Sequence, residues 1–401
     1  MLTFNYEARN PATGQKVKAN VQADNERAAA RLIQEQGLSP LEITLQKDQK
    51  TGFFKRIGSK DKILFARQLS TLINAGLPLV QSLRMVQKQT VNKQLNGVVG
   101  EVIGDVESGK SFSAALSIHP TVFNTIFVNL VAAGEASGTL DGALERLATQ
   151  QEKDAEILSK IRGAMIYPAV VVVVMVAVVT FMLVTVLPQV NILYQGLPGA
   201  KLPLLTTVLL TVSGLIIKFW WVFIILAVIA FIYTSRWART VAGKKVVDGL
   251  KMHTKPFGPL FMKVYMARFC RTGETLVSSG VPLLQMLDIV SKSINNVYVE
   301  ESINKAIVKV KGGKSLADAL EGDPNFLELV PNMLRIGEQS GSVEQMLSRT
   351  ADYYEKEVDN QIKAINTIIE PILMIVLGVV ALIIVAAVLL PIYGLAGQNL
   401  G

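Results

Sequence analysis

FARQLSTLINAGLPLVQSL, residues 65–83, recurs in altered form as FCRTGETLVSSGVPLLQML at residues 269–287, which begins 204 residues later. The positions that stay identical include an arginine, a threonine and the turn between two predicted helices: Arg67 and Arg271, Thr71 and Thr275, Gly76 and Gly280, Pro78 and Pro282. A repeat at this distance indicates a duplicated domain and not a solenoid of short units.

The correspondence continues beyond these stretches. Gly109-Lys110-Ser111 corresponds to residues 313–315 at the same offset, and the offset becomes 203 after one residue drops out. The later matches are turn glycines, acids and prolines: Gly134 and Gly337, Glu135 and Glu338, Gly138 and Gly341, Pro168 and Pro371, Pro188 and Pro391. The two copies therefore allow any site suggested for one to be checked in the other.

Uncharged apolar runs follow each copy. Residues 169–187 and 372–390 carry no charge and are close to the ~20 residues that cross a bilayer as a helix. Residues 220–234 form a third, shorter run, and Lys218 separates it from the apolar residues 204–217. We expect three transmembrane helices, with 204–218 either an extension of the second or a helix in the membrane interface.

The charge distribution predicts the orientation. Basic residues gather before the first and third spans and after the second, whereas residues 188–218 contain only two lysines. The positive-inside rule places the N-terminus in the cytoplasm and the C-terminus outside. The start of the chain lacks a charged region followed by a small-residue cleavage site, so we expect no removable signal peptide. The flanking lysines and arginines, attracted to anionic lipid, account for the net charge of +8, and nucleic-acid binding is the weaker explanation.

The first 48 residues alternate in the manner of short strands around one helical stretch, residues 24–36, so we expect a small α/β unit. The fold class is mainly α, a polytopic membrane protein with two duplicated cytoplasmic six-helix bundles. The expected segments in chain order are the α/β unit 1–48, a linker 49–61, bundle 62–168, span 169–187, an external loop and interfacial helix 188–219, span 220–234, a cytoplasmic connector 235–264, bundle 265–370, span 371–391 and an external tail 392–401.

The residues Phe65, Leu69, Leu72 and Ile73 form one apolar helical stripe, which Gly76 ends. Six such helices are expected in each copy, and the sixth runs toward the membrane. Pro168 and Pro371 mark where the two sixth helices meet the bilayer, and a proline there either kinks a continuous helix or begins a new one.

Residues 104–111 match the G-x4-G-K-S pattern of a phosphate-binding loop. That chemistry requires a strand before the loop, but the preceding residues have helical spacing. The second copy has Val308 in place of the first glycine. We therefore favour a helix–turn–helix joint with a serine cap over nucleotide binding.

Other repeated residues have structural and functional interpretations. The GEASG and GEQSG segments are predicted to stop one helix and start the next, with Gly134, Gly138, Gly337 and Gly341 as turn residues. Glu135 and Glu338 either contact a neighbouring molecule or pair with an arginine in their own bundle. Arg67 and Arg271 lie off the apolar stripe, on a solvated face or in a contact between bundles or with a partner.

The sequence shows no constellation typical of catalysis or metal binding. His119 and His253 are far apart, and the single cysteine, Cys270, stands where the other copy has Ala66, which favours a small packed residue. We expect no enzyme, no cofactor and no metal. The spans carry no charge at mid-depth, which argues against a transporter.

Several of these motifs together resemble a known family. FARQLSTLINAGLPLVQSL, GEASGTL, MIYPAV and EPILMIVLG are similar to the inner-membrane platform proteins of type II secretion and type IV pilus machines, the PilC/GspF family. The resemblance implies a hexameric assembly ATPase, pilin or pseudopilin subunits, other inner-membrane assembly proteins, membrane lipid and further copies of the chain as partners. One departure is Glu370 before Pro371, where the first copy has Tyr167 before Pro168.

The leading hypothesis is a non-enzymatic inner-membrane platform of a type IV pilus assembly machine, which couples a cytoplasmic ATPase to pilin extraction and filament growth. The alternative is the platform of a type II secretion system. An ATPase that uses residues 104–111 and a small transporter rank below both.

Overall fold

The computed structural model describes residues 2–9, 16–23, 30, 32, 34, 37, 39–45, 57–195 and 203–398. The chain divides into two compact units, Met1–Gly58 and Ser59–Gly401, and each is described by itself.

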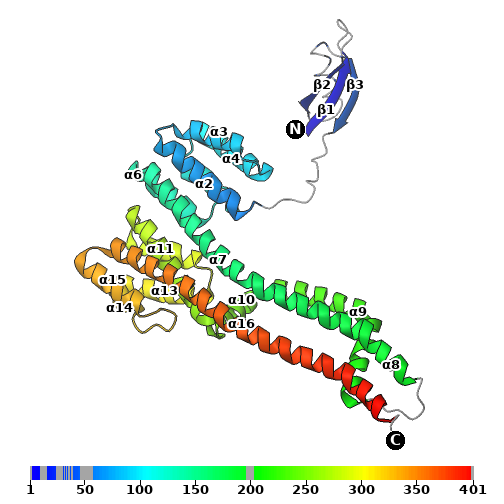
Figure 1. Ribbon diagram of the computed structural model, residues 1–401. Helices are drawn as coiled ribbons and strands as arrows, with labels where there is room; N and C mark the ends of the chain where they lie inside the picture. Colours follow the sequence, from blue (N-terminus) through cyan, green and yellow to red (C-terminus); the bar gives the residue numbers. More distant parts are fainter. Residues whose placement is uncertain are drawn as a thin grey trace. The chain divides into compact units, whose positions relative to one another are not determined.

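The first unit contains a three-stranded sheet of β1 (Leu2–Arg9), β2 (Lys16–Ala23) and β3 (Ser39–Leu45). The order is β2-β1-β3, and both neighbours run antiparallel to β1 (Figure 1). Most of the helix expected at 24–36, and most of the linker expected at 49–61, lie outside the described residues.

The first copy consists of α2 (Ser59–Asn74), α3 (Leu79–Gln89), α4 (Lys93–Glu107), α5 (Phe112–Ser117), α6 (Thr125–Ser137) and α7 (Leu140–Phe181). Helix α2 begins inside the predicted linker. Asn92, Ser111 and Asn124 cap α4, α5 and α6 by accepting backbone N–H bonds. The core contains three phenylalanine rings with centroids 5.0–6.4 Å apart: Phe65, Phe123 and Phe127.

The second copy repeats this order with α11 (Phe257–Ser278), α12 (Leu283–Ser293), α13 (Val297–Lys311), α14 (Leu316–Leu320), α15 (Leu329–Ser340) and α16 (Val343–Gln398). The turns repeat as well. Gly76 and Gly280 have φ of 84° and 80°, a conformation that favours glycine. The duplication seen in the sequence is therefore also a duplication of backbone conformation.

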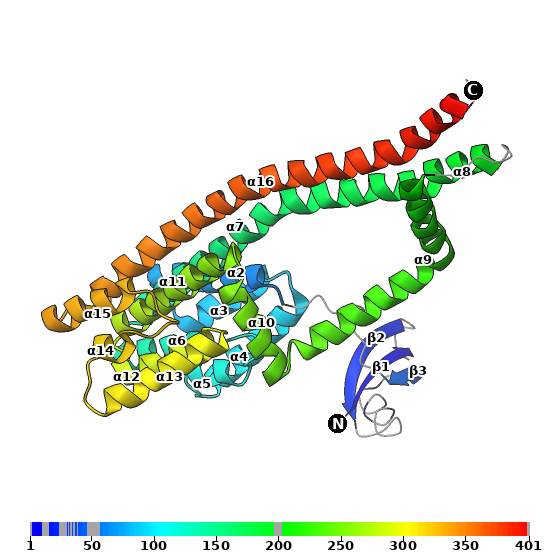
Figure 2. The same ribbon diagram turned by 90° about the horizontal axis from the view of Figure 1, so that it is seen from below.

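The described residues contain three candidate membrane spans, which lie within Leu140–Ile192, Thr206–Trp237 and Val343–Pro391. Pro168, Pro371 and Pro391 all lie inside continuous helices, which resolves the question left open by the sequence in favour of uninterrupted helices. After α7 the first span continues through a π-helical turn, η1 (Met182–Val186), into α8 (Leu187–Gln195). Helices α7 and α16 run side by side in both views (Figures 1 and 2).

Two predicted connections contain helices. Residues 188–195, expected in an external loop, belong to α8. The expected connector 235–264 contains α10 (Val241–His253) and the start of α11. Thr240 caps α10, and its buried Asp248 accepts a bond from the backbone N–H of Val297, so α10 packs on the second copy.

The second span is part of α9 (Leu204–Trp237), which has one non-helical residue, Phe219 (φ −119°, ψ 18°). Before this break, the Thr206 and Ser213 hydroxyls donate to the carbonyls of Ala387 and Leu183 at 3.2 and 2.6 Å. After the break, α9 stands apart from α7 and α16 (Figure 2). Residues 204–218 thus form a distinct, packed half of a bent helix.

Candidate functional site

Each copy ties its first helix to its last by an arginine. Arg67 on α2 bonds Glu152 on α7 at 2.5 and 2.7 Å and Glu145 at 2.6 Å. Arg271 on α11 bonds Glu355 on α16 at 2.9 Å and also reaches Asp352. Glu152 and Glu355 occupy equivalent positions, so the same charge-assisted link fixes both copies to the helix that continues into the membrane.

These bonds change the acidity of the first pair of carboxylates. The hydroxyl of Ser70 and then Arg67 hold the pKa of Glu145 below its usual value. Arg67 does the same for the pKa of Glu152. In the described residues, both arginines bond to carboxylates of their own copy.

Glu135 and Glu338 also act within their own copies. The carboxylate of Glu135 accepts the backbone N–H groups of Phe112 and Ser113 at 2.5 and 2.9 Å. Glu338 accepts those of Leu316 and Ala317 at 2.7 and 3.1 Å. Each acid therefore holds the first turn of a short helix, where backbone N–H groups lack partners. The partners are backbone N–H groups, not the arginine that the sequence suggested for a contact within the bundle.

The glycines of the two GExSG segments divide into two roles. Gly138 and Gly341 end α6 and α15 in the left-handed region, at φ of 72° and 70°. Gly134 and Gly337, expected in the turn, are helical and buried instead. A Cβ on Gly134 would lie 2.6 Å from the Cβ of Ala143, so this glycine allows α6 and α7 to approach closely.

Residues 104–111 form the predicted helix–turn–helix joint. The element before the turn is helix α4, and Gly109 has φ of 96°. The amine of Lys110 lies 2.8 Å from Asp105, and Ser111 caps α5 through the N–H of Ala114. A phosphate-binding loop follows a strand, so that its backbone amides point at the phosphate, whereas this turn follows a helix.

Residues with possible reactive or metal-binding chemistry are scattered. No group of three or more His, Cys, Asp or Glu side chains gathers at a possible metal site in the described part of the chain. Among the acidic residues that the structure describes, only Glu101 lies within ion-pair distance of His119, at 3.5 Å. Cys270 is fully buried, and burial raises the pKa of its thiol.

The contact between the two copies is made by residues that the sequence analysis did not select. Gln150 on α7 is 3% exposed; its amide donates to Thr272 at 2.8 Å and accepts from Thr275 at 2.9 Å. Arg146 donates to the hydroxyl of Ser279 at 3.1 Å. The two copies thus meet through a layer of side-chain hydrogen bonds, and the geometry that these bonds require fixes how α7 lies on α11.

Ion pairs and an apolar cluster extend this contact toward the membrane. Three pairs join α7 to the second copy: Lys153 with Glu355 at 3.7 Å, Asp154 with Arg268 at 3.5 Å, and Lys160 with Asp359 at 2.7 Å. Below them, one cluster of buried side chains combines α7, α11 and α16: Ile157, Leu260, Val264, Val358, Ile362 and Ile365. The two copies and the two long helices that continue into the candidate membrane spans are therefore packed as one body.

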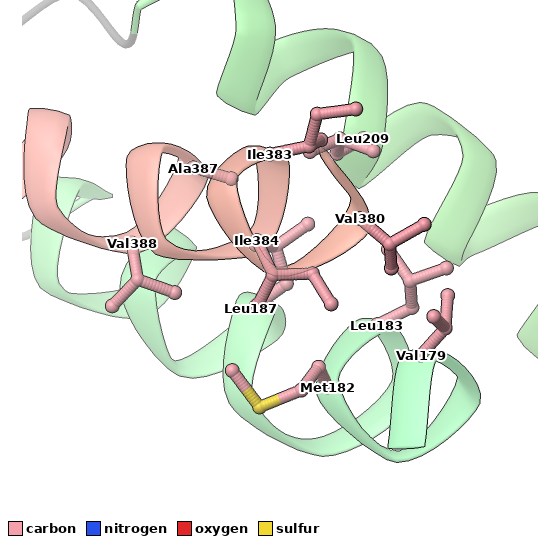
Figure 3. A pocket seen from close by; sticks show the side chains of 10 residues that line it. All are labelled: Val179, Met182, Leu183, Leu187, Leu209, Val380, Ile383, Ile384, Ala387 and Val388. Atoms are coloured by element: carbon pink, nitrogen blue, oxygen red, sulfur yellow. The ribbon is translucent and has the colours of Figure 1, made fainter. Parts of the chain in front are cut away.

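Inside the candidate membrane region, an apolar cavity of about 170 Å³ lies between α16 and the end of the first span, where α7 passes through η1 into α8, and α9 adds one side chain (Figure 3). Leu183 and Leu187 reach it from one side, and Val380 and Ile384 from the other. At the opposite end of the spans, the side chains of Tyr167 and Glu370, the residues before the two prolines, are exposed. The cavity has no polar lining that could bind an ion.

Comparison with known proteins agrees with the duplicated architecture. The family model for type II secretion system protein F matches residues 65–188 and 269–391, and the model for its N-terminal domain matches residues 1–44. The chain is 40% identical to "Type IV pilus assembly protein PilC" of Thermus thermophilus over 99% of both chains. It is 34% identical to the Myxococcus xanthus protein of that name, over 98% of this chain and 95% of the relative. "Type II secretion system protein F" of Pseudomonas aeruginosa is also 34% identical, over 98% of this chain and 99% of the relative.

Proposed function

The chain belongs to the type II secretion system protein F family, and we propose that it is the inner-membrane platform of a type IV pilus assembly machine. The greater similarity to the relative named for pilus assembly than to the one named for secretion supports the pilus over the secretion system. The platform of a type II secretion system is the second candidate, because relatives with that name cover nearly the whole chain.

One observation carries the mechanical part of the proposal. The arginine of each copy links its first helix to a helix that runs without a break into the membrane. Helix α7 has 42 residues and is therefore about 60 Å long. A force applied to the cytoplasmic copies would be carried along α7 and α16 to the membrane, since the two copies are packed against each other above it.

We propose that this force comes from a hexameric assembly ATPase and that pilin subunits leaving the bilayer receive it. Other inner-membrane assembly proteins, lipid and further copies of this chain complete the proposed set of partners. The protein itself would be no enzyme. Purified full-length protein should hydrolyse no ATP, and hydrolysis that disappears on Lys110→Ala would instead support the lower-ranked ATPase.

The proposed arrangement places an N-terminal α/β unit and two six-helix bundles in the cytoplasm. The N-terminus would be cytoplasmic, the C-terminus external, and residues 204–218 would lie in the outer interface. Basic residues after the second span, Arg236 and Arg239 among them, support this orientation. A transporter remains the lowest alternative; solute uptake by vesicles that contain only this protein would support it.

The function is tested by deleting the gene in its host and counting surface pili by electron microscopy. We expect pili to disappear and to return when the gene is restored. Intact pili together with a loss of secreted proteins from the culture supernatant would support the secretion platform. Normal pili with normal secretion would refute both.

A further inference from the structure

The contact between the two copies is head-to-tail, because the copies contribute different faces. The first copy contributes Arg146 and Gln150 on α7, and its Gln150 is 3% exposed. The equivalent residues on α16, 203 positions later, are Arg349 and Tyr353. Tyr353 is 49% exposed, and Arg349 makes no ion pair with any residue described in the structure. The face that is buried in the first copy is thus free in the second.

The opposite side shows the complementary difference. The second copy receives α7 on Thr272, Thr275 and Ser279, which are all buried. The equivalents of the last two are Thr71 on α2 and Ala75 just after it, and both are exposed. A head-to-tail contact between two repeats always leaves one free face at each end, and such contacts propagate into rings or filaments.

We propose that a second copy of this chain docks across these two free faces and repeats the internal contact between chains. The α16 face comprises Arg349, Tyr353, Lys356, Asn360 and Lys363. The α2–α7 face of the neighbouring chain comprises Leu64, Gln68, Thr71, Ala75, Glu152 and Glu156. The proposal rests on the self-association proposed above and adds the surface through which it occurs.

Charge complementarity supports this pairing. Within the chain, Lys153 pairs with Glu355 and Lys160 pairs with Asp359. The equivalents in the opposite copies are Lys356 with Glu152 and Lys363 with Glu156. Two of the three ion pairs of the internal contact therefore keep their signs when the contact is repeated between chains. Like-charged faces would have excluded the repeat.

The direction of the membrane helices is compatible with the same repeat. Helices α7 and α16 run side by side toward the same end of the unit (Figures 1 and 2). The rotation and translation that superpose the first copy on the second therefore keep the membrane helix of that copy in the bilayer. Applying it again places the first copy of the next chain in the same membrane.

The contact between chains should be weaker than the internal one. The internal contact contains Ile157, which is 6% exposed in an apolar cluster, whereas its equivalent, Asn360, is polar and exposed. Tyr353 and Leu64, which are 49% and 54% exposed, supply the large apolar side chains of the proposed surface. A surface of this composition favours reversible association, since it buries less apolar area.

Disulfide cross-linking of full-length protein in membranes tests the surface. Two differently tagged chains, both with Cys270→Ala, carry Thr71→Cys in one and Tyr353→Cys in the other. These positions are equivalent to Thr275 and Gln150, whose side chains bond at 2.9 Å. Mild oxidation should produce a mixed covalent dimer. The matched control replaces Tyr353→Cys with Val308→Cys, which is 72% exposed on α13 and should give no such dimer.

A charge swap makes the test independent of cysteine reactivity. Lys363→Glu on the Tyr353→Cys chain should reduce the mixed dimer, and Glu156→Lys on the Thr71→Cys chain should restore it. A mixed dimer no more abundant than the Val308 control overturns the proposal. So does equal cross-linking by Tyr353→Cys alone, which would show a symmetric α16–α16 contact. In either case the mass of the wild-type chain is measured as well. An oligomeric mass would then refute only this surface and would still support self-association.

Discussion

Removal of the Glu338 carboxylate should loosen the short helix α14 while it leaves the rest of the second copy folded. Glu338 accepts two backbone N–H bonds, at 2.7 and 3.1 Å, from the first turn of α14. Hydrogen bonds to charged groups contribute about 1.5–3 kcal/mol each, but water replaces part of this at a half-buried carboxylate. We take about 2 kcal/mol for the loss on Glu338→Ala, which corresponds to about a 30-fold rise in the local opening equilibrium.

Amide hydrogen exchange of the full-length protein in detergent or nanodiscs measures this opening directly. Peptides that contain Leu316 and Ala317 should exchange about 30-fold faster in Glu338→Ala. Glu135→Ala should do the same for α5 in the first copy, which makes the duplication an internal replicate. The matched control is Glu321→Ala, because Glu321 is an exposed acid that pairs with Arg335 at 2.7 Å. Exchange that stays unchanged in Glu338→Ala, or that rises equally in Glu321→Ala, would refute the reasoning.

Three other predictions follow from the same geometry. Gly337→Ala places a Cβ 2.8 Å from the Cα of Val343 and should lower the free energy of unfolding by about 1–3 kcal/mol. Gly97→Ala on α4 is the control, because its Cβ meets nothing within 4 Å, and it should not destabilise the protein. Similar melting temperatures for the two variants would contradict this prediction. The pKa values of Glu145 and Glu152 are lowered in the folded state, so their contribution to stability is present at neutral pH and is lost as the pH falls through those values. Melting temperatures measured from pH 7 downward should show this loss, and Arg67→Met should diminish it; a pH profile that Arg67→Met leaves unchanged would count against the link. The buried thiol of Cys270 should react with a maleimide only in denaturant, and labelling of the native protein would show that α11 opens.

The sequence predicted the helical, duplicated and membrane-spanning character of the chain because each depends on local patterns. Gly76 and Gly280 recur where left-handed backbone is needed, and uncharged runs of span length stand out in any context. Residues such as Glu135 were recognised as repeated, but their partners, 22 and 23 residues earlier in the chain, were not predictable from spacing.

The contact between the copies was missed for a physical reason. Comparison of the copies reveals residues that both retain, whereas a head-to-tail contact uses a different face of each. Gln150 is buried and its equivalent Tyr353 is exposed, so the pair looks like an unconserved surface position. Helix α10 was not predicted; it packs on the adjacent α11 and also on α13, to which a bond from Val297 to Asp248 joins it across 49 residues of chain.

The central claim is that the two copies work as one body in pilus assembly, and the host strain that lacks the gene offers the most direct test. Gln150→Arg places a charge in the buried polar layer with Thr272 and Thr275, whereas Val308→Arg places the same charge on an exposed helix face. Surface pili are counted by electron microscopy at equal membrane levels of both variants. The account predicts that Val308→Arg restores pili and Gln150→Arg does not; pili restored equally by both would contradict it.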